Sequence, residues 1–251
     1  QTTVDIRTTA GALTVAGSGT TAGNQLDLDI DAVTLKGFSG LTVATGTDDE
    51  LKFGSLTLQV TDAGNLVISN AITGTARTGN TPVTSGDITL TTASGDVQID
   101  AAVSTGAATT TGSTGSDAAT SGSISVTAGT AGVIKGTGSL VTGAATVNTT
   151  AAGGSDTATV GSITLSGNEV TREGTTGADT AFVVTFGTAN SNGGTNTAGK
   201  LNVTTDGSAA AGEIRITSAA ALTVGELNTT NADQTTVDIR TTAGALTVAG
   251  S

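Results

Sequence analysis

Carboxylates are the groups in this sequence best suited to chemistry, and three of them alternate along one short segment. Asp27, Asp29 and Asp31 occur in the run LDLDID. In a β-strand, alternate residues share a face and lie about 7 Å apart. Carboxylates at this spacing could bind Ca²⁺, which accepts several carboxylate oxygens. The alternative, which we favour, is a solvated outer face with the interleaved leucine and isoleucine residues buried behind it.

A second acidic cluster is formed by Asp48, Asp49 and Glu50 in a segment expected to be a turn. Here too a solvated turn is the favoured interpretation. The glycine- and aspartate-rich nine-residue repeats that bind calcium in toxin-type β-rolls are absent from the sequence. We therefore expect no metal site.

The sequence lacks the aromatic platforms for sugar rings and the commonest proton shuttle, histidine. β-Helical enzymes that act on polysaccharides need paired acids and usually aromatic platforms for sugar rings. The sequence contains no His, Cys, Trp or Tyr. Its many Ser and Thr residues have no recognisable neighbouring base to activate them. We expect no catalytic residue, no cofactor and no enzymatic function.

The charge balance excludes two kinds of partner. Twenty-one acidic residues against nine basic ones give a net charge of −12. Nucleic acids and anionic membranes attract clustered Lys and Arg, so neither is expected as a partner. A helix that spans a membrane needs about 18 or more consecutive apolar residues. No apolar run approaches that length, so no helical membrane insertion is expected in this segment.

One segment, QTTVDIRTTAGALTVAGS, occurs twice, at 1–18 and at 234–251. Identity at every position, including those where a surface residue would be free to vary, indicates recent tandem duplication. Residues 1–233 are therefore interpreted as one full repeat, and residues 234–251 as the start of the next identical repeat.

Within the repeat, a shorter pattern recurs, in which an alternating strand, a small-residue turn and a second alternating strand follow one another. These subunits average about 33 residues, a length typical of the repeats of solenoid proteins. They start at Val4, Val33, Leu56, Ile88, Ile124, Ile163 and Leu201, and Val237 restarts the series. Alternation places the apolar residues of each strand, such as Val4, Ile6, Leu13 and Val15, on one inner face.

A third alternating block follows in many subunits. These blocks lie at 26–30, 145–147, 182–186 and 222–224. Three short strands per unit predict an all-β parallel β-helix, or β-solenoid, with about seven three-strand turns in the repeat 1–233. An antiparallel sandwich or barrel is the alternative, but the joints show almost no Asn-Gly or Asp-Gly hairpin signals.

Three longer polar joints occur at the same phase of consecutive subunits, at 111–122, 150–161 and 188–200. We expect them to project from one side of the stack. They are either tolerated insertions or a ridge that recognises a glycan or a cell surface. Threonine rows at 109–111 and 146–150 resemble the hydroxyl ladders of ice-binding solenoids, but their position is expected to drift between turns.

The motifs GDITL (86–90), GSISV (122–126) and GSITL (161–165) resemble the repeats of filamentous-haemagglutinin-like and related giant bacterial surface adhesins. The resemblance implies a right-handed parallel β-helix, export to the cell exterior and a role as a long fibrous stalk. It carries no catalytic residue.

Taken together, these patterns predict a structural repeat of a long extracellular fibre, sheath or adhesin stalk at a bacterial-type cell surface. The expected partners are identical repeats stacked end to end, in one chain or between chains. The alternative is a cell-surface or glycan-binding module that uses the joints at 111–122, 150–161 and 188–200.

Overall fold

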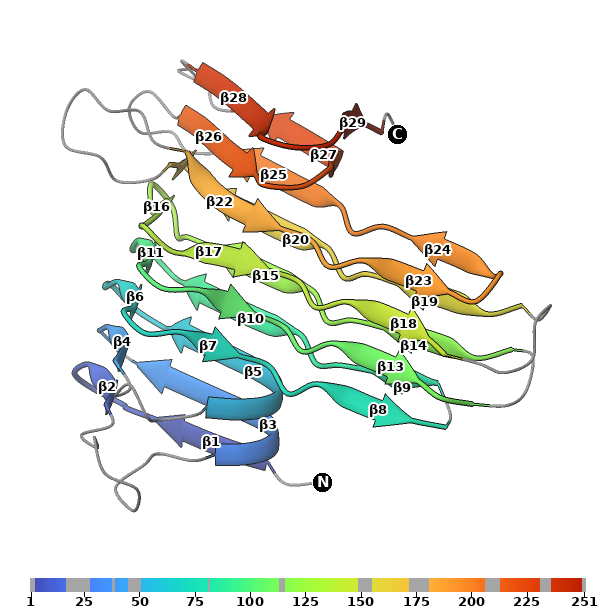
Figure 1. Cartoon of the computed structure of the whole chain (residues 1–251). Helices are drawn as coiled ribbons and strands as arrows, with labels where there is room; N and C mark the ends of the chain where they lie inside the picture. The colour runs from blue at the N-terminus through green and yellow to red at the C-terminus, as the bar shows by residue number, and fades with distance from the viewer. Residues whose placement is uncertain are drawn as a thin grey trace.

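The computed structural model of the chain is a solenoid of stacked parallel β-strands (Figure 1). It describes residues 3–16, 28–37, 39–44, 51–80, 82–112, 116–148, 155–171, 181–205, 213–230 and 236–249. No helix occurs among the described residues, so this part of the chain contains no helix long and apolar enough to cross a membrane. The all-β solenoid predicted from the sequence is confirmed.

Sheet A forms one face of the solenoid body and contains nine strands, each paired in parallel with the next. Its strands, in spatial order, are β1 (Thr3–Arg7), β3 (Leu28–Gly37), β5 (Leu51–Val60), β10 (Ile88–Thr92), β15 (Ile124–Thr127), β20 (Ile163–Gly167), β25 (Leu201–Thr205), β27 (Leu222–Thr229) and β29 (Leu246–Val248).

Sheet B faces sheet A across the core. One column of strands contains β2 (Leu13–Ala16), β4 (Leu41–Ala44), β6 (Leu66–Ile68), β11 (Val97–Ile99), β16 (Val133–Lys135) and β21 (Glu169–Val170). A second column contains β7 (Ile72–Thr73), β12 (Val103–Ser104), β17 (Ser139–Val141) and β22 (Phe182–Thr185). The longer β26 (Glu213–Ser218) pairs with both β21 and β22 and so joins the two columns; β28 (Thr236–Thr241) then pairs with β26.

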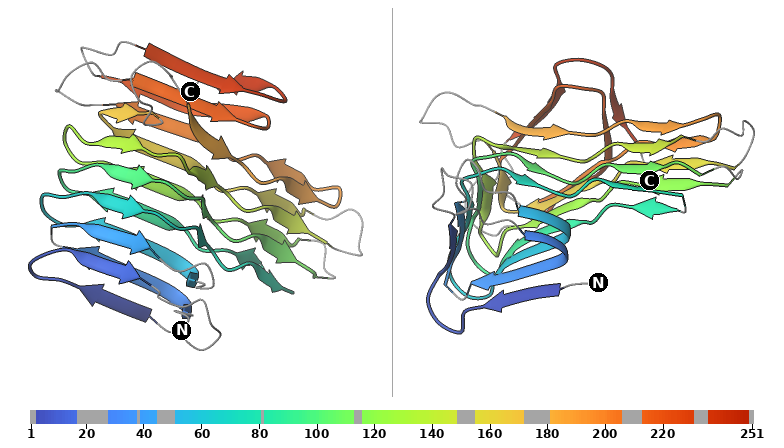
Figure 2. Two further views of the ribbon diagram at one scale, coloured as in Figure 1. Left: turned by 60° about the vertical axis from the view of Figure 1, so that its left-hand side comes forward. Right: turned by 60° about the horizontal axis from the view of Figure 1, so that its bottom comes forward.

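Sheets C and D form an arm that projects from the side of the body (Figures 1 and 2). Sheet C contains β8 (Arg77–Gly79), β13 (Ala108–Thr110), β18 (Ala145–Val147) and β23 (Ala189–Ser191). Sheet D contains β9 (Val83–Thr84), β14 (Ala118–Thr120), β19 (Thr157–Thr159) and β24 (Thr195–Thr197).

Two kinds of coil follow from this order, where a coil is one complete turn from sheet A back to sheet A. The four central coils run through sheets A, B, C and D, whereas the coils at both ends alternate between sheets A and B. Coil length reflects the difference. Val33 is the register partner of Leu56, so a short coil joins them without an arm. Ile124 is the register partner of Ile163, and the longer coil between them includes an arm.

The sequence predicts three strands in every turn. In the structure, a coil contains either two strands or five. The third blocks also fall in different sheets. Residues 26–30 partly overlap β3, which continues to Gly37, while the blocks at 145–147, 182–186 and 222–224 lie in sheets C, B and A. Alternating hydrophobicity marks a half-buried strand but carries no information on which sheet receives it.

Alternation builds the core as predicted. In β10 and β15, the side chains of Ile88, Leu90, Ile124 and Val126 are fully buried and stack in register. The core continues along the body from Leu35 to Val224, and Leu13, Val15 and Ile239 of the end coils pack against it while partly exposed. Burying a column of such side chains contributes about 1.5–3 kcal/mol for each residue.

The two copies of the repeated segment occupy different sheets. In the first copy β1 belongs to sheet A, where Val4 lies opposite Val33, and β2 belongs to sheet B. In the second copy β28 belongs to sheet B, where Val237 lies opposite Ile214, and β29 belongs to sheet A. The prediction that Val237 follows Leu201 in the same series is wrong, because β27 supplies one additional sheet A strand between them.

Candidate functional site

The neck, where the chain crosses between body and arm, is lined by glycines that stack from coil to coil. On the side that leads from sheet D to sheet A, the stack contains Gly86, Gly122, Gly161 and Gly199, and Gly86 lies against Gly54 of β5 in the preceding coil. A Cβ atom on Gly122 would overlap the carbonyl oxygen of Gly86, and one on Gly161 would overlap that of Gly122. Close backbone approach thus explains the first residue of the GDITL, GSISV and GSITL motifs.

The second motif residue ties each coil to the next. The Asp87 Oδ1 atom accepts a hydrogen bond of 2.7 Å from the Ser123 backbone N–H. The Ser123 Oγ atom in turn accepts from the Ser162 N–H at 3.1 Å, and Ser162 Oγ accepts from the Lys200 N–H at 3.3 Å. These side chains satisfy N–H groups at the corners, so hydrogen bonding along the stack continues outside the strands.

Two buried side-chain hydroxyl groups make hydrogen bonds across the neck. Ser85 Oγ accepts from the Gly122 N–H at 2.8 Å and donates to the Gly106 carbonyl oxygen at 2.6 Å. Thr105 Oγ1 accepts from the Gly143 N–H at 2.9 Å and donates to the Gly122 carbonyl oxygen at 3.0 Å. Each hydroxyl therefore bridges the two sides of the neck as well as two successive coils.

The arm has a small core of its own, made of alanine and valine. Ala108, Ala119, Ala145 and Ala158 are fully buried between sheets C and D. Small side chains let the two sheets approach closely, which suits a thin projection. The three polar joints share one phase as predicted, because β14, β19 and β24 pair in register, but they contain strands of the arm in addition to turns.

Two buried carboxylates stack inside the arm. Asp117 and Asp156 precede β14 and β19, and the Asp117 N–H donates a 3.0 Å hydrogen bond to Asp156 Oδ1. The Asp117 carboxylate packs directly over Gly112, where a Cβ atom would collide with it. These aspartates order the start of the sheet D strands.

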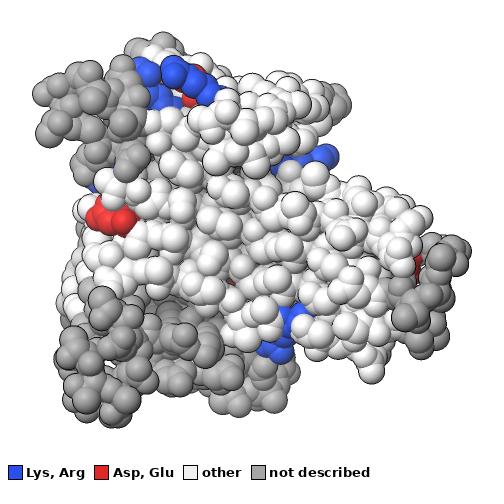
Figure 3. All heavy atoms as spheres, in the orientation of Figure 1, with Lys and Arg blue, Asp and Glu red and all other residues white. Residues whose placement is uncertain are grey.

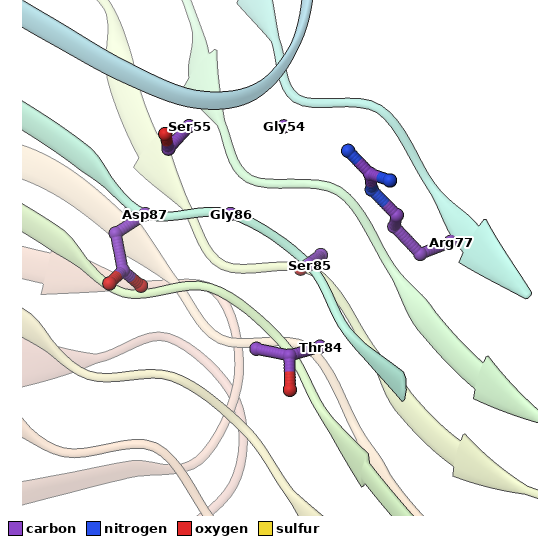
Figure 4. Close-up of a pocket in the computed structure, with 7 residues that line it drawn as sticks. All are labelled: Gly54, Ser55, Arg77, Thr84, Ser85, Gly86 and Asp87. Carbon is purple, nitrogen blue, oxygen red and sulfur yellow. The ribbon is translucent and has the colours of Figure 1, made fainter. Parts of the chain in front are cut away.

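A groove of about 420 Å³ lies beside the first arm-bearing coil. The coil that precedes it has no arm. The groove is lined by Gly54, Ser55, Arg77, Thr84, Ser85, Gly86 and Asp87 (Figure 4). The Asp87 carboxylate points away from Arg77, and its Oδ1 atom accepts the hydrogen bond from the Ser123 N–H (Figure 4). The groove marks the boundary between the two kinds of coil.

Of the acidic candidates, the structure describes only the backbone of Asp29 and Asp31. The backbone of Asp29 and Asp31 lies in β3, with Asp29 in register with Lys52, whereas Asp27 lies outside the described residues. Residues 48–50 also lie outside them. Among the described residues, no group of three or more His, Cys, Asp or Glu side chains could hold a metal ion.

The threonine rows do not drift as expected. Thr109 lies in register with Thr78 and Thr146 on sheet C, and Thr57, Thr89, Ser125 and Thr164 form a similar outward row on sheet A. Thr is a favoured outward strand residue, so these rows alone assign no ligand. Uncharged residues form most of the described part of the face in Figure 3.

Ion pairs occur in the central coils, where Lys135 Nζ lies 2.8 Å from Asp96 Oδ2, and in the end coils. Arg7 binds Asp5 in β1, and the equivalent Arg240 binds Asp238 in β28, with Nε 2.6 Å from Oδ1. In β26 the Arg215 Nε donates to Glu213 Oε2 at 2.9 Å, which lowers the pKa of Glu213 below its ordinary value of 4.5. Hydrogen bonding by Arg7 likewise lowers the pKa of Asp5.

No protein-family model, curated protein or solved structure matches this chain.

Proposed function

We propose that the chain is a structural repeat of a long extracellular fibre, sheath or adhesin stalk at a bacterial-type cell surface, stacked end to end with identical repeats. One observation carries the proposal. The repeated segment pairs along opposite edges in its two copies: the first copy is hydrogen-bonded to β3 and β4, which follow it, and the second to β26 and β27, which precede it.

These two sets of pairings are compatible in a single strand. A strand inside a parallel sheet has two edges, and among the described strands each copy pairs along the edge opposite to the one that the other copy uses. One copy can therefore be held between β26 of one repeat and β3 of the next. The strand edges that are open at the end of one repeat would then be hydrogen-bonded to the next repeat.

The exposed apolar side chains lie where this continuation would cover them. Ile6 is 45% exposed at one end, and Val237 and Val248 are 45% and 73% exposed at the other. In the central coils, the equivalent inward positions are fully buried. A following coil would bury these side chains, at about 25 cal/mol per Å² of apolar surface.

A mechanical role as a fibre or stalk is supported by the neck and the core. The columns of glycine, hydroxyl and aliphatic residues that form them all repeat along one axis. The net charge of −12 would keep neighbouring fibres apart and hydrated. The resemblance of the GSITL-type motifs to adhesin repeats supports a location outside the cell.

Electron microscopy of the native assembly tests the proposal. The expected result is a fibre whose averaged power spectrum has a layer line near about 4.8 Å along its axis. Discrete particles without that spacing would contradict it and favour a separate globular module.

Glycan or cell-surface binding is a second candidate, favoured by the projection of the arm from the body. Its strands β23 and β24 present exposed polar side chains, among them Asn190 and Asn196. A glycan array probed with the whole chain tests this function. Saturable binding lost in the Asn190→Ala/Asn196→Ala variant would support it, with Ser125→Ala on sheet A as the control.

A further inference from the structure

The exchange of sheets between the two copies determines how successive repeats are oriented. Sheet A contains eight strands from β1 to β27, which span seven full coils, and the chain then crosses to β28 in sheet B. One repeat, from Gln1 to the start of the second copy, therefore advances seven and a half coils. At about 4.8 Å per coil this is about 36 Å, compared with about 34 Å for the seven coils expected from the sequence.

The arm has a fixed position within each coil. Sheets C and D are always inserted where the chain leaves sheet B and before it re-enters sheet A, as in the path β11, β12, β13, β14, β15. All four arm-bearing coils use this same edge of the body, and the opposite edge, where sheet A leads into sheet B, carries short turns (Figure 2).

We infer that successive repeats in the stack are rotated by half a coil, so that their arms project alternately from opposite sides of the fibre. In a repeat that starts from β28, the strand equivalent to β1 lies in sheet B, and every later strand exchanges sheets with its equivalent. The next arm is then inserted where the chain passes from sheet A to sheet B. This inference rests on the proposed function.

The apolar columns remain continuous through such a junction. Val237 lies above Ile214, and the equivalent Val4 lies below Val33; Ile239 lies above Ile216, and the equivalent Ile6 lies below Leu35. In the other sheet, Leu246 lies above Leu222, and the equivalent Leu13 lies below Leu41. Every one of these columns is aliphatic on both sides of the junction, so the half-coil rotation creates no buried polar mismatch.

The alternation also separates the open edges of the arms. Among the described strands, β8 and β9 end the arm on one side and β23 and β24 end it on the other, which gives each arm four edge strands that could pair with another arm. With alternating arms, two arms on the same side start 15 coils, or about 72 Å, apart. Without alternation, with seven coils in each repeat, they would start about 34 Å apart.

Cysteine pairs test the half-coil offset in the chain itself, which contains no native cysteine. Thr217 and Arg240 lie opposite each other in neighbouring strands. At a strand spacing of about 4.8 Å, the Thr217→Cys/Arg240→Cys variant should oxidise to a disulfide with loss of free thiol. The matched Thr204→Cys/Arg240→Cys variant tests the in-phase arrangement, in which Val237 would follow Leu201, and should retain free thiols. Oxidation of the second pair instead would overturn the inference.

A chain with two successive copies, residues 1–233 followed by 1–251, tests the arms by electron microscopy. One continuous rod with arms on opposite sides is the expected result. A continuous rod with both arms on one side would overturn the inference and leave the proposed function standing. Two separate bodies with no continuous rod would overturn the proposed function, and the inference with it.

Discussion

Val237 lies opposite Ile214 in sheet B, although Val4, at the same position of the identical segment, lies opposite Val33 in sheet A. Both copies form strands, because the alternation of Val, Ile and polar residues is a local property. Which sheet receives the strand depends on the number of strands that precede it. Local sequence thus determines the strand, and the lengths of the upstream coils determine its place in the solenoid.

Val184 in β22 provides a direct test of the inward face. Its side chain is fully buried, in register with Leu140 and Ser218. Val184→Asp would place an unpaired charge in the core and should cost about 4 kcal/mol or more of the free energy of unfolding. Thermal unfolding followed by circular dichroism measures this. The control is Val183→Asp on the outward face; equal stability of the two variants would contradict the assigned strand orientation.

The strand starts at Val33, Leu56, Ile88, Ile124 and Ile163 could be predicted from the sequence because each begins a run of alternating apolar and polar residues. The structure places them in one column in register. Arm strands such as Ala118–Thr120 and Thr195–Thr197 could not be recognised in this way, since they contain no large apolar residue. The only sequence feature that indicates these strands is the recurrence of small residues at the same position of successive subunits.

The neck was predictable in part. The recurring glycine of the GSITL-type motif is visible in the sequence. The sequence does not show that a carbonyl oxygen of the preceding coil occupies the space that a side chain would need. Ser85 and Thr105 could not be distinguished from the many other Ser and Thr residues. Their role depends on contacts with Gly122 and Gly143 in the next coil, which only the register of the coils defines.

Gly122→Ala tests close approach at the neck. The added methyl group would overlap the Gly86 carbonyl oxygen, and neither backbone can move without shifting a whole coil. We expect a loss of about 3 kcal/mol in the free energy of unfolding, measured by denaturant titration. Gly40→Ala is the control, since its Cβ atom would meet its nearest neighbours at 3.6 Å. Equal effects of the two substitutions would contradict the packing described for the neck.

Ser121→Ala tests the hydroxyl ladder. Ser121 Oγ accepts a 3.0 Å hydrogen bond from the Gly161 N–H, and both residues are buried. Removing the acceptor leaves that N–H without this partner, at an expected cost of about 1–3 kcal/mol. Amide hydrogen exchange should show faster exchange at Gly161, whereas Ser125→Ala on the outer face of sheet A should leave it unchanged. Unaltered protection of Gly161 in the Ser121 variant would exclude this role.

The ion pair of β26 makes the last coils sensitive to acid. The hydrogen bond from Arg215 lowers the pKa of Glu213, and Thr236 of β28 contributes in the same direction. Because the folded-state pKa lies below the ordinary value of 4.5, the stabilisation is complete above 4.5 and is lost as the pH falls through the folded-state value. The pair is partly exposed, so it should contribute no more than about 1 kcal/mol.

Titration of the Glu213 side-chain carboxyl by NMR measures this effect. Arg215→Gln should raise the pKa of Glu213 toward 4.5 and remove its share of the pH dependence of stability between that value and the lower folded-state value. Arg77→Gln, in the arm, is the control and should leave the Glu213 titration unchanged. If the Glu213 titration is the same in the Arg215 variant as in the parent chain, the ion pair does not hold β26 in solution. Between β26 and β28, the backbone pairing, the Ile214–Val237 and Ile216–Ile239 contacts and the 4.0 Å approach of Arg215 Nη1 to Asp238 Oδ2 would remain.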